Sequence, residues 1–571
     1  MILSPSANKI VTDRYFLEGV ETQWSELAKR VATSIASVEN NPGHWAERFE
    51  EMLNACKFIP AGRILRNAGR QRGSLFNCYH LPIGDSIDEI GDCAANALKL
   101  WSDGGGVGIN FSSLRPEGAE IRGLGGRSSG LVSFMQAIDG LAACIESGGS
   151  RRAASLGSCD VSHPEIESFI DSKLVDGRIS YFNISVNITK SFLESVLSGK
   201  KFPLTFRGKS YKEVNAKELW EKILKNMVDV AEPGLLIWDN LIKNNSYYFS
   251  PITGVNPCGE ATLSPYECCD LGSLVLPKFV DASGRTKWAD IESTVALAVR
   301  FLDNVIDVNK YRLTANQRMA QSGRRIGLGV MGLADYLFAK GLKYGSRAAL
   351  DATEDLLKCV RDTAYNASVE IACEKGAFPA YDKLMYHKAS FVRHLPVRIR
   401  SLILEHGIRN VTLLALAPTG TISLIPEVCS SIEPLFAKAY KRADRVGERV
   451  YIHPVMEQSI REGTPIPDWF VDAGDLSPEE HLEVQALCQK YTDGAVSKTI
   501  NVHSKFTVDQ LSEVLFEYLF DLKGVTVYRD GARGGQILNR IDADEAKKIV
   551  SNSTTSQDAE AVTCASGTCE L

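Results

Sequence analysis

A short polar stretch, Asn256-Pro257-Cys258-Gly259-Glu260, places an amide, a thiol and a carboxyl group at alternate positions. Alternate side chains of an extended segment share one side, so these three groups could meet one small substrate. Pro257 keeps the residue before it extended, and Gly259 lets the backbone turn. Such a trio suits thiol chemistry and proton transfer. A turn with a half-buried structural cysteine gives the same pattern, so the other motifs of the chain must decide.

A second chemical feature is a pair of cysteines near the carboxyl end, Cys564 and Cys569, in a polar segment. Residues 551–561 cannot support a packed core, which predicts a flexible tail. A zinc site would need two more ligands, and the tail has no histidine. A dithiol that carries electrons to a buried site is therefore favoured, with incidental cysteines as the alternative.

Two glycine-containing loops could bind an anionic ligand. The segment 417–423 combines a glycine with hydroxyl residues after a buried strand, and its N–H and O–H donors suit a phosphate, although it is not a Walker loop. The glycine-rich segment 102–110 is followed by Arg115, Arg122 and Arg151. Guanidinium groups fork around phosphate oxygens. An ordinary strand–helix turn and solvated surface loops are the alternatives.

The composition is that of a globular protein. Of the 571 residues, 44% are hydrophobic and 23% are charged. The net charge of −6 gives no sign of a nucleic-acid or membrane surface. No apolar run approaches the roughly 18–20 residues that cross a bilayer, and no secretory signal begins the chain. We therefore expect a cytoplasmic protein.

Fourteen cysteines are too few for a disulfide scaffold at this length. Eight of them lie in apolar or helical contexts, where a cysteine behaves as a small hydrophobic residue, and we expect these in the core. They are Cys56, Cys93, Cys144, Cys159, Cys359, Cys373, Cys429 and Cys488.

Three regions must position these groups. Residues 1–75 are predicted to be helical, residues 76–535 alternate short apolar runs with amphipathic segments as parallel strand–helix units do, and residues 536–571 are predicted to form the flexible tail. Within them the pattern predicts helices at 24–38, 45–56, 219–230, 291–308 and 347–375, and buried strands at 179–186 and 411–417.

Taken in order, these motifs resemble the catalytic subunit of ribonucleotide reductases, most closely the adenosylcobalamin-dependent (class II) branch. The resemblance runs from about Arg14 to Arg533 and resumes at the tail. Several motifs in the family's order are far more specific than any one of them. They are FIPAGRILRNAG (58–69), NCYHLPIGDSIDEI (77–90), DGGGVGINFSSLRPEGAEIRG (103–123), NPCGE (256–260), YECCDLGSL (266–274), RRIGLGVMGLADYL (324–337), APTGTISLI (417–425) and KGVTVYRDGAR (523–533).

The resemblance implies a fold and a role for the opening stretch. The expected fold is a ten-stranded α/β barrel of two five-stranded parallel halves, preceded by the small helical region. A central finger loop would carry Cys258, shielded from water and oxygen. Cys258 resembles the thiyl-radical cysteine that removes the 3′-hydrogen of the ribose. Glu260 resembles the base that takes the 3′-hydroxyl proton, and Asn256 the amide that fixes the 2′-hydroxyl end.

The resemblance also implies a source of electrons. Cys78 and Cys269 resemble the dithiol that becomes a disulfide as the 2′-hydroxyl leaves as water. Cys268 is the less favoured partner, because the run that starts at Cys269 matches the family's Cys-Asn-Leu-Gly-Ser. Asp270 stands where that run has asparagine. The tail pair is similar to the one that re-reduces the active-site disulfide and is recycled by a thioredoxin-like protein.

Substrate and effector residues are implied in the same way. The turn that grips the substrate phosphates, and the residues beside it, would be Pro418, Thr419, Gly420, Thr421 and Ile422 with Asn77 and Gly106. A deoxynucleotide or ATP effector at a homodimer interface would meet Asp85, Arg115 and Arg122, and the loop at Arg151 and Arg152 would relay its signal. The match begins near residue 14, without the family's ATP cone, so we expect specificity control without an on/off control by dATP.

The radical source separates the two nearest alternatives. Class I catalytic subunits have adjacent tyrosines near the end of the barrel, and here residues 525–529 contain Tyr528 alone, as in class II. The second alternative is a class I subunit that needs a metal-containing partner. A nucleotide-binding regulator without catalysis is the third, and the five placed thiols argue against it.

Overall fold

The helical start of the chain consists of α1 (Pro5–Arg14), α2 (Trp24–Ala36) and α3 (Pro42–Asn54). The computed structural model describes residues 2–121, 125–147, 151–174, 178–444, 447–532 and 538–552. Gln23 and Glu26 form a capping box that starts α2, and Pro42 occupies the first turn of α3, where a missing N–H costs nothing. The helices predicted at 24–38 and 45–56 are confirmed, each ending two residues early.

One half of the main sheet consists of five parallel strands in the order in which the chain visits them. Each neighbouring pair is parallel, and long crossovers join the strands. They are β2 (Cys78–His80), β3 (Gly106–Asn110), β8 (Ser155–Asp160), β9 (Phe182–Ile188) and β12 (Gly234–Ile237). The strand predicted at 179–186 is β9, displaced toward the carboxyl end.

The other half contains two further parallel pairs. β15 (Cys268–Val275) pairs with β16 (Ile326–Met331), and β19 (Thr499–Val502) pairs with β20 (Gly524–Arg529). The two halves meet through antiparallel pairs, β15 with β2 and β20 with β12. The short β1 (Phe58–Pro60) adds an antiparallel partner to β15.

The segment 411–417 connects the two pairs of the second half. It is buried, but it makes two single parallel bridges, Leu328 to Leu414 and Leu416 to Val496, instead of the continuous strand that the sequence predicts. The reason is a tertiary contact, because the carboxylate of Asp493 accepts the N–H groups of Leu413 and Leu414 at 2.8 Å each. With this segment each half has five parallel stretches, which agrees with the predicted fold.

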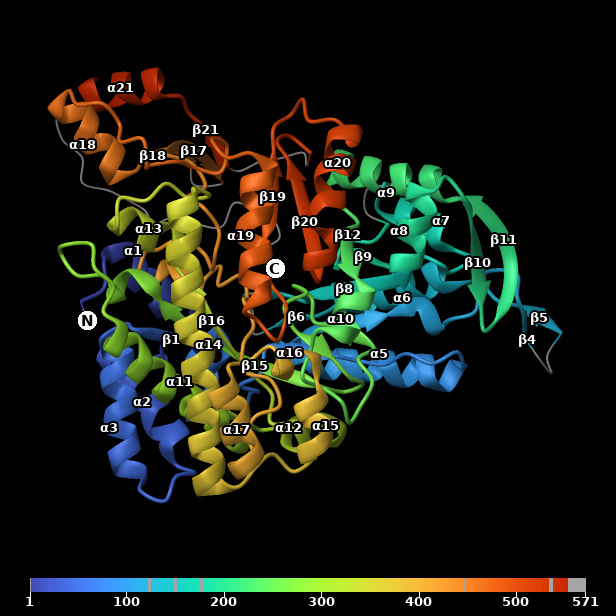
Figure 1. The fold of residues 1–571 in the computed structure, drawn as a ribbon, viewed down its shortest axis with the longest axis horizontal. Helices are drawn as coiled ribbons and strands as arrows, with labels where there is room; N and C mark the ends of the chain where they lie inside the picture. Colours follow the sequence, from blue (N-terminus) through green and yellow to red (C-terminus); the bar gives the residue numbers. More distant parts are fainter. Residues whose placement is uncertain are drawn as a thin grey trace.

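Helices surround the sheet (Figure 1). The helices predicted at 219–230, 291–308 and 347–375 are confirmed as α9 (Ala216–Val230), α11 (Trp288–Val308) and α14 (Arg347–Lys375). The others are α4 (Gly62–Asn67), α5 (Ile87–Ser102), α6 (Leu131–Ala143), α7 (Ile166–Ile170), α8 (Lys190–Leu197), α10 (Trp238–Lys243), α12 (Thr314–Gly323), α13 (Leu333–Ala339), α15 (Lys383–Lys388), α16 (Ser390–Arg393), α17 (Val397–His406), α19 (Pro478–Lys490) and α20 (Val508–Tyr518).

Short hairpins project from this framework. They are β4 (Glu120–Ile121) with β5 (Gly126–Arg127), β6 (Glu146–Ser147) with β7 (Arg151–Arg152), and β10 (Lys201–Phe206) with β11 (Lys209–Asn215). In the part of the chain that the structure describes, no helix is long and apolar enough to cross a membrane.

A small cap with its own hydrophobic cluster lies at one end of the molecule (Figure 1). It contains the sheet β18 (Gly447–Ile452), β17 (Ala439–Asp444) and β21 (Leu538–Arg540), with α18 (Pro454–Glu462) and α21 (Ala543–Asn552). Residues 538–552 thus form secondary structure where the sequence predicted a flexible tail. Ala546 is buried against this cluster, which explains why the segment folds.

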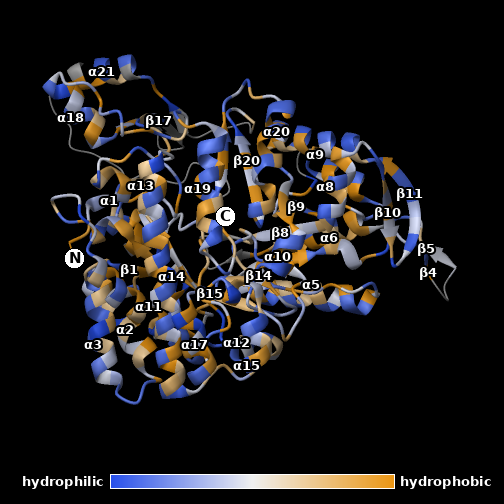
Figure 2. Cartoon of the chain, viewed as in Figure 1, coloured by the Kyte–Doolittle hydropathy of each residue, from blue (hydrophilic) through white to orange (hydrophobic). Residues whose placement is uncertain are grey.

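The hydrophobic core lies between the strands and the surrounding helices, and outer helices such as α3 are hydrophilic on their outer side (Figure 2). Cys56, Cys93, Cys159 and Cys488 are buried as predicted. The prediction is wrong for Cys144 and Cys373, which are exposed, while Cys359 and Cys429 are half-buried and pack against the core. Cys359 and Cys373 lie on α14, where the helix face decides burial, whereas Cys429 lies outside helices and strands.

Candidate active site

A short hairpin carries the polar stretch with which the sequence analysis began. β13 (Gly254–Val255) pairs with β14 (Thr262–Leu263), and residues 256–261 form its tip. The Asn256 N–H donates to the carbonyl of Ala261 at 3.2 Å, and the Gly259 N–H donates to the carbonyl of Asn256 at 3.0 Å. Gly259 has φ of +78°, a conformation that a side chain would strain.

The glycine-rich strand β3 lets this hairpin lie directly on the sheet. A Cβ atom added at Gly106 would lie 2.9 Å from Cγ of Pro257, and one at Gly108 would overlap the carbonyl oxygen of Val255. On the other side, the Ala495 N–H donates to the carbonyl of Glu260 at 2.7 Å. The hairpin therefore contacts both halves of the sheet, as expected of a finger loop.

Cys78 and Cys269 lie directly opposite each other on β2 and β15. Both are almost fully buried. Cys268 lies opposite Tyr79, and because neighbouring residues of a strand point to opposite faces, Cys268 and Cys269 face different sides of the sheet. The structure thus brings Cys78 together with Cys269 and not with Cys268.

Two groups of the hairpin tip, the Asn256 amide and the Glu260 carboxyl, contact Cys78 of this pair. The Cys78 thiol donates to Oε1 of Glu260 at 3.5 Å, and Nδ2 of Asn256 donates to the Cys78 sulfur at 3.2 Å. Oδ1 of Asn256 accepts the Ala261 N–H at 2.9 Å, which fixes the orientation of the amide. A carboxyl, an amide and a thiol from distant parts of the sequence therefore share one buried position.

Burial raises the pKa of both acidic groups at this position, Glu260 and Cys78. It raises the pKa of Glu260, against hydrogen bonds from Asn256 and Cys78 that lower it. Oε2 of Glu260 has no partner among the described residues, so it is free to accept a proton from a ligand. Burial, and then the neighbouring Glu260, raise the pKa of Cys78 well above its ordinary value. Cys78 therefore stays a thiol at neutral pH.

Burial also raises the pKa of Asp270, the residue that stands where the resembling family has asparagine. Asp270 is fully buried, and neither carboxyl oxygen has a hydrogen-bond partner among the described residues. Burial raises its pKa well above the ordinary value. A protonated carboxyl group is neutral and similar in shape to an amide, so it can occupy the position where the resembling family has asparagine.

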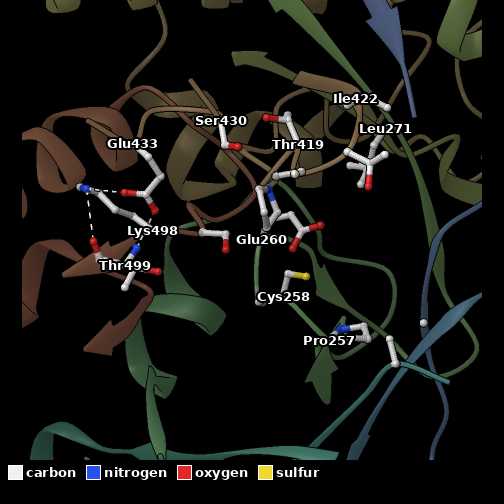
Figure 3. Close-up of a pocket in the computed structure, with 18 of the residues that line it drawn as sticks. Pro257, Cys258, Glu260, Leu271, Thr419, Ile422, Ser430, Glu433, Lys498 and Thr499 are labelled. Carbon is white, nitrogen blue, oxygen red and sulfur yellow. Dashed lines mark hydrogen bonds and ion pairs between the residues drawn. The ribbon is translucent and has the colours of Figure 1, made fainter. Parts of the chain in front are cut away.

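We expected the sulfur of Cys258 to be shielded, but the side chain of Cys258 is exposed. It stands at the hairpin tip and opens into a cavity of about 620 Å³. Figure 3 shows Cys258 below Glu260 in the view, with Thr419 and Ser430 on the wall above them. The sulfur is therefore accessible to whatever the cavity binds.

The predicted phosphate turn forms part of the same cavity. Thr419 has φ of +56°, its Oγ1 accepts the Ser431 N–H at 2.8 Å, and its carbonyl accepts the Ser423 N–H at 2.9 Å. These contacts hold the turn in a fixed shape. All predicted substrate residues line the cavity, namely Asn77, Gly106, Pro418, Thr419, Gly420, Thr421 and Ile422.

Several lining residues were missed by the sequence analysis. Lys498 is fully buried and pairs with Oε2 of Glu433 at 2.8 Å, while Oε1 of Glu433 accepts the Thr499 N–H at 2.8 Å (Figure 3). Nothing in the sequence marks this pair, because its members are 65 residues apart. Arg14, Arg63 and Arg66 of the helical region also line the cavity.

Two of the predicted effector residues, Asp85 and Arg115, are not among the described residues that line this cavity. Asp85 accepts the Arg115 N–H at 2.8 Å and pairs with the Arg115 and Arg207 guanidinium groups at 3.1 and 3.2 Å. Asp85 and Arg115 thus come together, paired with each other. Arg122, Cys564 and Cys569 lie outside the described residues, and only the backbone of Arg151 and Arg152 is described, in β7.

Two parallel half-sheets around a hairpin, with a thiol, a carboxyl and an amide beside a facing cysteine pair, define an α/β enzyme of thiol chemistry. A family model described as "Ribonucleotide reductase, barrel domain" matches residues 76–528, and one described as "Ribonucleotide reductase, all-alpha domain" matches residues 2–73. The chain therefore belongs to the ribonucleotide reductase large-subunit family.

Curated relatives extend this result. A protein of Mycobacterium tuberculosis named "Vitamin B12-dependent ribonucleoside-diphosphate reductase" is 35% identical, over 94% of this chain and 81% of its own length. One of the same name from Thermoplasma acidophilum is 34% identical, over 93% of this chain and 70% of its own. A "Ribonucleoside-diphosphate reductase subunit alpha" of Chlamydia muridarum is 26% identical, over 86% and 55%.

Proposed function

We propose that this chain is an adenosylcobalamin-dependent ribonucleotide reductase that makes 2′-deoxyribonucleotides for DNA synthesis. One observation carries the proposal: Cys258 opens into the cavity lined by the 418–422 turn, next to Glu260, Asn256 and Cys78. The similarity to relatives named vitamin B12-dependent supports the cofactor. Family membership supports the reaction.

In this reaction the sulfur of Cys258, as a thiyl radical, takes the hydrogen atom from the 3′-carbon of the ribose. Glu260, as the carboxylate, takes the 3′-hydroxyl proton at Oε2, the oxygen that has no partner among the described residues. The 2′-hydroxyl leaves as water with a proton from the Cys78 thiol. Cys78 and Cys269 together supply two electrons and become a disulfide, and the proton of the Cys269 thiol goes to the 2′-carbon. Glu260 returns its proton to the 3′-oxygen, and the Cys258 thiol returns its hydrogen atom to the 3′-carbon. The sum is one ribonucleotide and one dithiol converted to one deoxyribonucleotide, one disulfide and one water.

The residues that line the cavity fit adenosylcobalamin in one respect. The Cys258 side chain is exposed in a cavity of about 620 Å³, within the size range of ligand pockets, so a group bound beside it can reach the sulfur. Adenosylcobalamin, when bound, supplies an unpaired electron by homolysis of its carbon–cobalt bond. Burial of the other site thiols as neutral SH groups leaves Cys258 as the accessible one.

A class I subunit is the less favoured alternative. The relatives named vitamin B12-dependent are 34–35% identical to this chain, whereas the chlamydial subunit alpha is 26% identical. Residues 525–529 also contain one tyrosine, where class I subunits have an adjacent pair. A regulator without catalysis would not need the buried cysteine pair.

Further parts of the proposal concern partners. We propose a homodimer in the cytoplasm, with a deoxynucleotide or ATP effector held by Asp85, Arg115, Arg122 and Arg151. The ion pairs of Asp85 keep it in place, and an effector phosphate would compete with Asp85 for Arg115. The tail cysteines, Cys564 and Cys569, would re-reduce the active-site disulfide and receive electrons from a thioredoxin-like protein.

The deciding experiment is a reductase assay with adenosylcobalamin and a dithiol, without a second subunit, on ribonucleoside di- and triphosphates. Deoxynucleotide should form with the cofactor and not without it. Cys258→Ser should lose activity at least about a thousandfold, because a hydroxyl group cannot carry the radical. Cys373→Ser, at an exposed cysteine outside the cavity, is the matched control. Product formation by Cys258→Ser would refute the mechanism.

A further inference from the structure

The N-terminal helical region supplies three arginines to the wall of the cavity: Arg14, Arg63 and Arg66. Arg14 is the last residue of α1, and Arg63 and Arg66 are three apart on α4, so they share one face of that helix. We call these three residues the arginine wall. Neither the family resemblance nor the relatives' names assign them a role.

The arginine wall adjoins the phosphate turn. Nη1 of Arg14 donates to Oγ1 of Thr421 at 3.4 Å. At the other end of α1, Oε1 of Glu427 accepts the hydroxyl groups of Ser4 and Ser6 at 2.5 and 3.0 Å. Both ends of α1 are therefore attached to the segment that contains the turn. This fixes Arg14 beside it.

A half-buried guanidinium group, that of Arg30, holds α1 and α4 together. Arg30 pairs with Glu21 at 2.6 Å, and its Nη2 donates to the carbonyls of Tyr15 and Leu65 at 3.4 and 3.0 Å. Tyr15 follows Arg14, and Leu65 precedes Arg66. The same clamp thus fixes the backbone next to both arginines.

Two charges of the wall, those of Arg14 and Arg66, are not neutralised by carboxylates of the described residues. Neither Arg14 nor Arg66 makes an ion pair with a carboxylate of the described residues, and Arg66 has no hydrogen-bond partner among them. Arg63 is buried against Gly104 and lies near the carboxyl group of Asp103. Two guanidinium groups therefore face the cavity with donors to spare, beside a turn suited to a phosphate.

We infer that Arg14 and Arg66 bind the terminal phosphate of the nucleotide substrate, with Arg63 contributing charge behind them. This rests on the proposed function and adds the part of the substrate that the helical region recognises. The turn at 418–422 holds the phosphate nearer the sugar, and the arginine wall holds the one beyond it. The shared chemistry is a terminal phosphate group, which is the β-phosphate of a diphosphate or the γ-phosphate of a triphosphate.

The test compares Arg14→Gln, Arg66→Gln and the double variant with the wild-type full-length chain, using CDP and CTP. Each loss of a charge-assisted contact should raise KM about tenfold, and the double variant about a hundredfold, with kcat changed less than about threefold. Arg66→Lys should recover part of the loss. A rise confined to CTP identifies the γ-phosphate, and an equal rise on both nucleotides identifies the β-phosphate.

Arg72→Gln, at an exposed arginine of the same region outside the cavity, is the matched control. Equilibrium dialysis with CDP and CTP and no cofactor gives the same comparison without turnover. If the wild-type chain bound nucleotide but made no product, the proposed function would be refuted. The affinities of the arginine variants in equilibrium dialysis would still test whether Arg14 and Arg66 bind the terminal phosphate. Unchanged affinity in the double variant, or an equal loss in Arg72→Gln, would overturn it.

Discussion

At the scale of single residues, burial decides which sulfur does what. Cys78 and Cys269 are buried, opposed and held as neutral thiols, whereas Cys258 is exposed in the cavity. A buried, protonated pair is suited to donate electrons and a proton together. An accessible sulfur is suited to exchange a hydrogen atom with a ligand.

The two adjacent cysteines of β15 allow a matched comparison. Cys269→Ser should reduce multiple turnover by at least about a hundredfold, because no disulfide with Cys78 can form, while Cys268→Ser should keep most activity. Peptide mass spectrometry after one turnover should find a Cys78–Cys269 disulfide in the wild type and in Cys268→Ser. A disulfide between Cys78 and Cys268 would contradict the assignment.

Glu260 makes a prediction about stability and pH. Its folded pKa is raised by burial above the ordinary value of 4.5, so the folded protein keeps a proton that the unfolded chain releases. The resulting stabilisation is present below pH 4.5 and is lost as pH rises through the folded pKa. Glu260→Gln, always neutral, should therefore match the wild type near pH 4 and melt at a higher temperature near pH 8.

Thermal unfolding of both proteins across this range measures the difference. Glu18→Gln, at an exposed carboxylate, should show no pH-dependent gain. A Glu260→Gln variant that is less stable than the wild type at pH 8 would mean that the folded protein favours the carboxylate of Glu260 and does not raise its pKa.

At the scale of elements, the fit between β3 and the finger hairpin positions the site. Gly106 and Gly108 leave room for Pro257 and for the Val255 carbonyl, so strand and hairpin lie in direct contact. From the sequence, these glycines were expected to be part of an anion-binding loop. The structure assigns them to backbone packing, with Gly106 also lining the cavity.

Gly108→Ala tests this contact. The added methyl group would overlap the Val255 carbonyl, so we expect a loss of about 1–3 kcal/mol in the free energy of unfolding and at least a tenfold loss of activity. Gly91→Ala in α5, where nothing lies within 4 Å, should instead be neutral or slightly stabilising. If both variants changed the free energy of unfolding in urea by the same amount, the hairpin could move away from β3 without loss of stability.

At the scale of the whole molecule, Asp493 connects the second half of the sheet to the helices. Its buried carboxylate accepts the N–H groups of Leu413, Leu414 and Gly494 at 2.8, 2.8 and 2.9 Å, and the Tyr365 hydroxyl at 2.7 Å. The carboxylate thus replaces ladder hydrogen bonds at the point where 411–417 joins the two strand pairs.

Asp493→Ala should lower the free energy of unfolding by about 3–5 kcal/mol, because buried N–H groups lose their acceptor. Urea unfolding followed by circular dichroism measures this loss. Asp509→Ala, at an exposed position in the first turn of α20, should cost less than about 1 kcal/mol. If Asp493→Ala lost no more free energy of unfolding than this control, Asp493 would have no role in holding the sheet together.

Much of the architecture could be predicted from local pattern alone. α14 has the predicted bounds, because 29 residues of helical spacing follow a serine cap. The motif order indicated two parallel half-sheets and the finger loop, and the run after Cys269 singled out that cysteine over Cys268. These features depend on residues close together in the sequence, where spacing and side-chain type carry the information.

Only the tertiary structure decided how distant residues meet. It placed Cys258 in an open cavity, bonded the main chain of 411–417 to a carboxylate, folded residues 538–552 into the cap, and brought Arg14 and Arg66 beside the phosphate turn. The physical reason is the same in each case. Burial and charge pairing are set by neighbours tens or hundreds of residues away, and no local spacing records them.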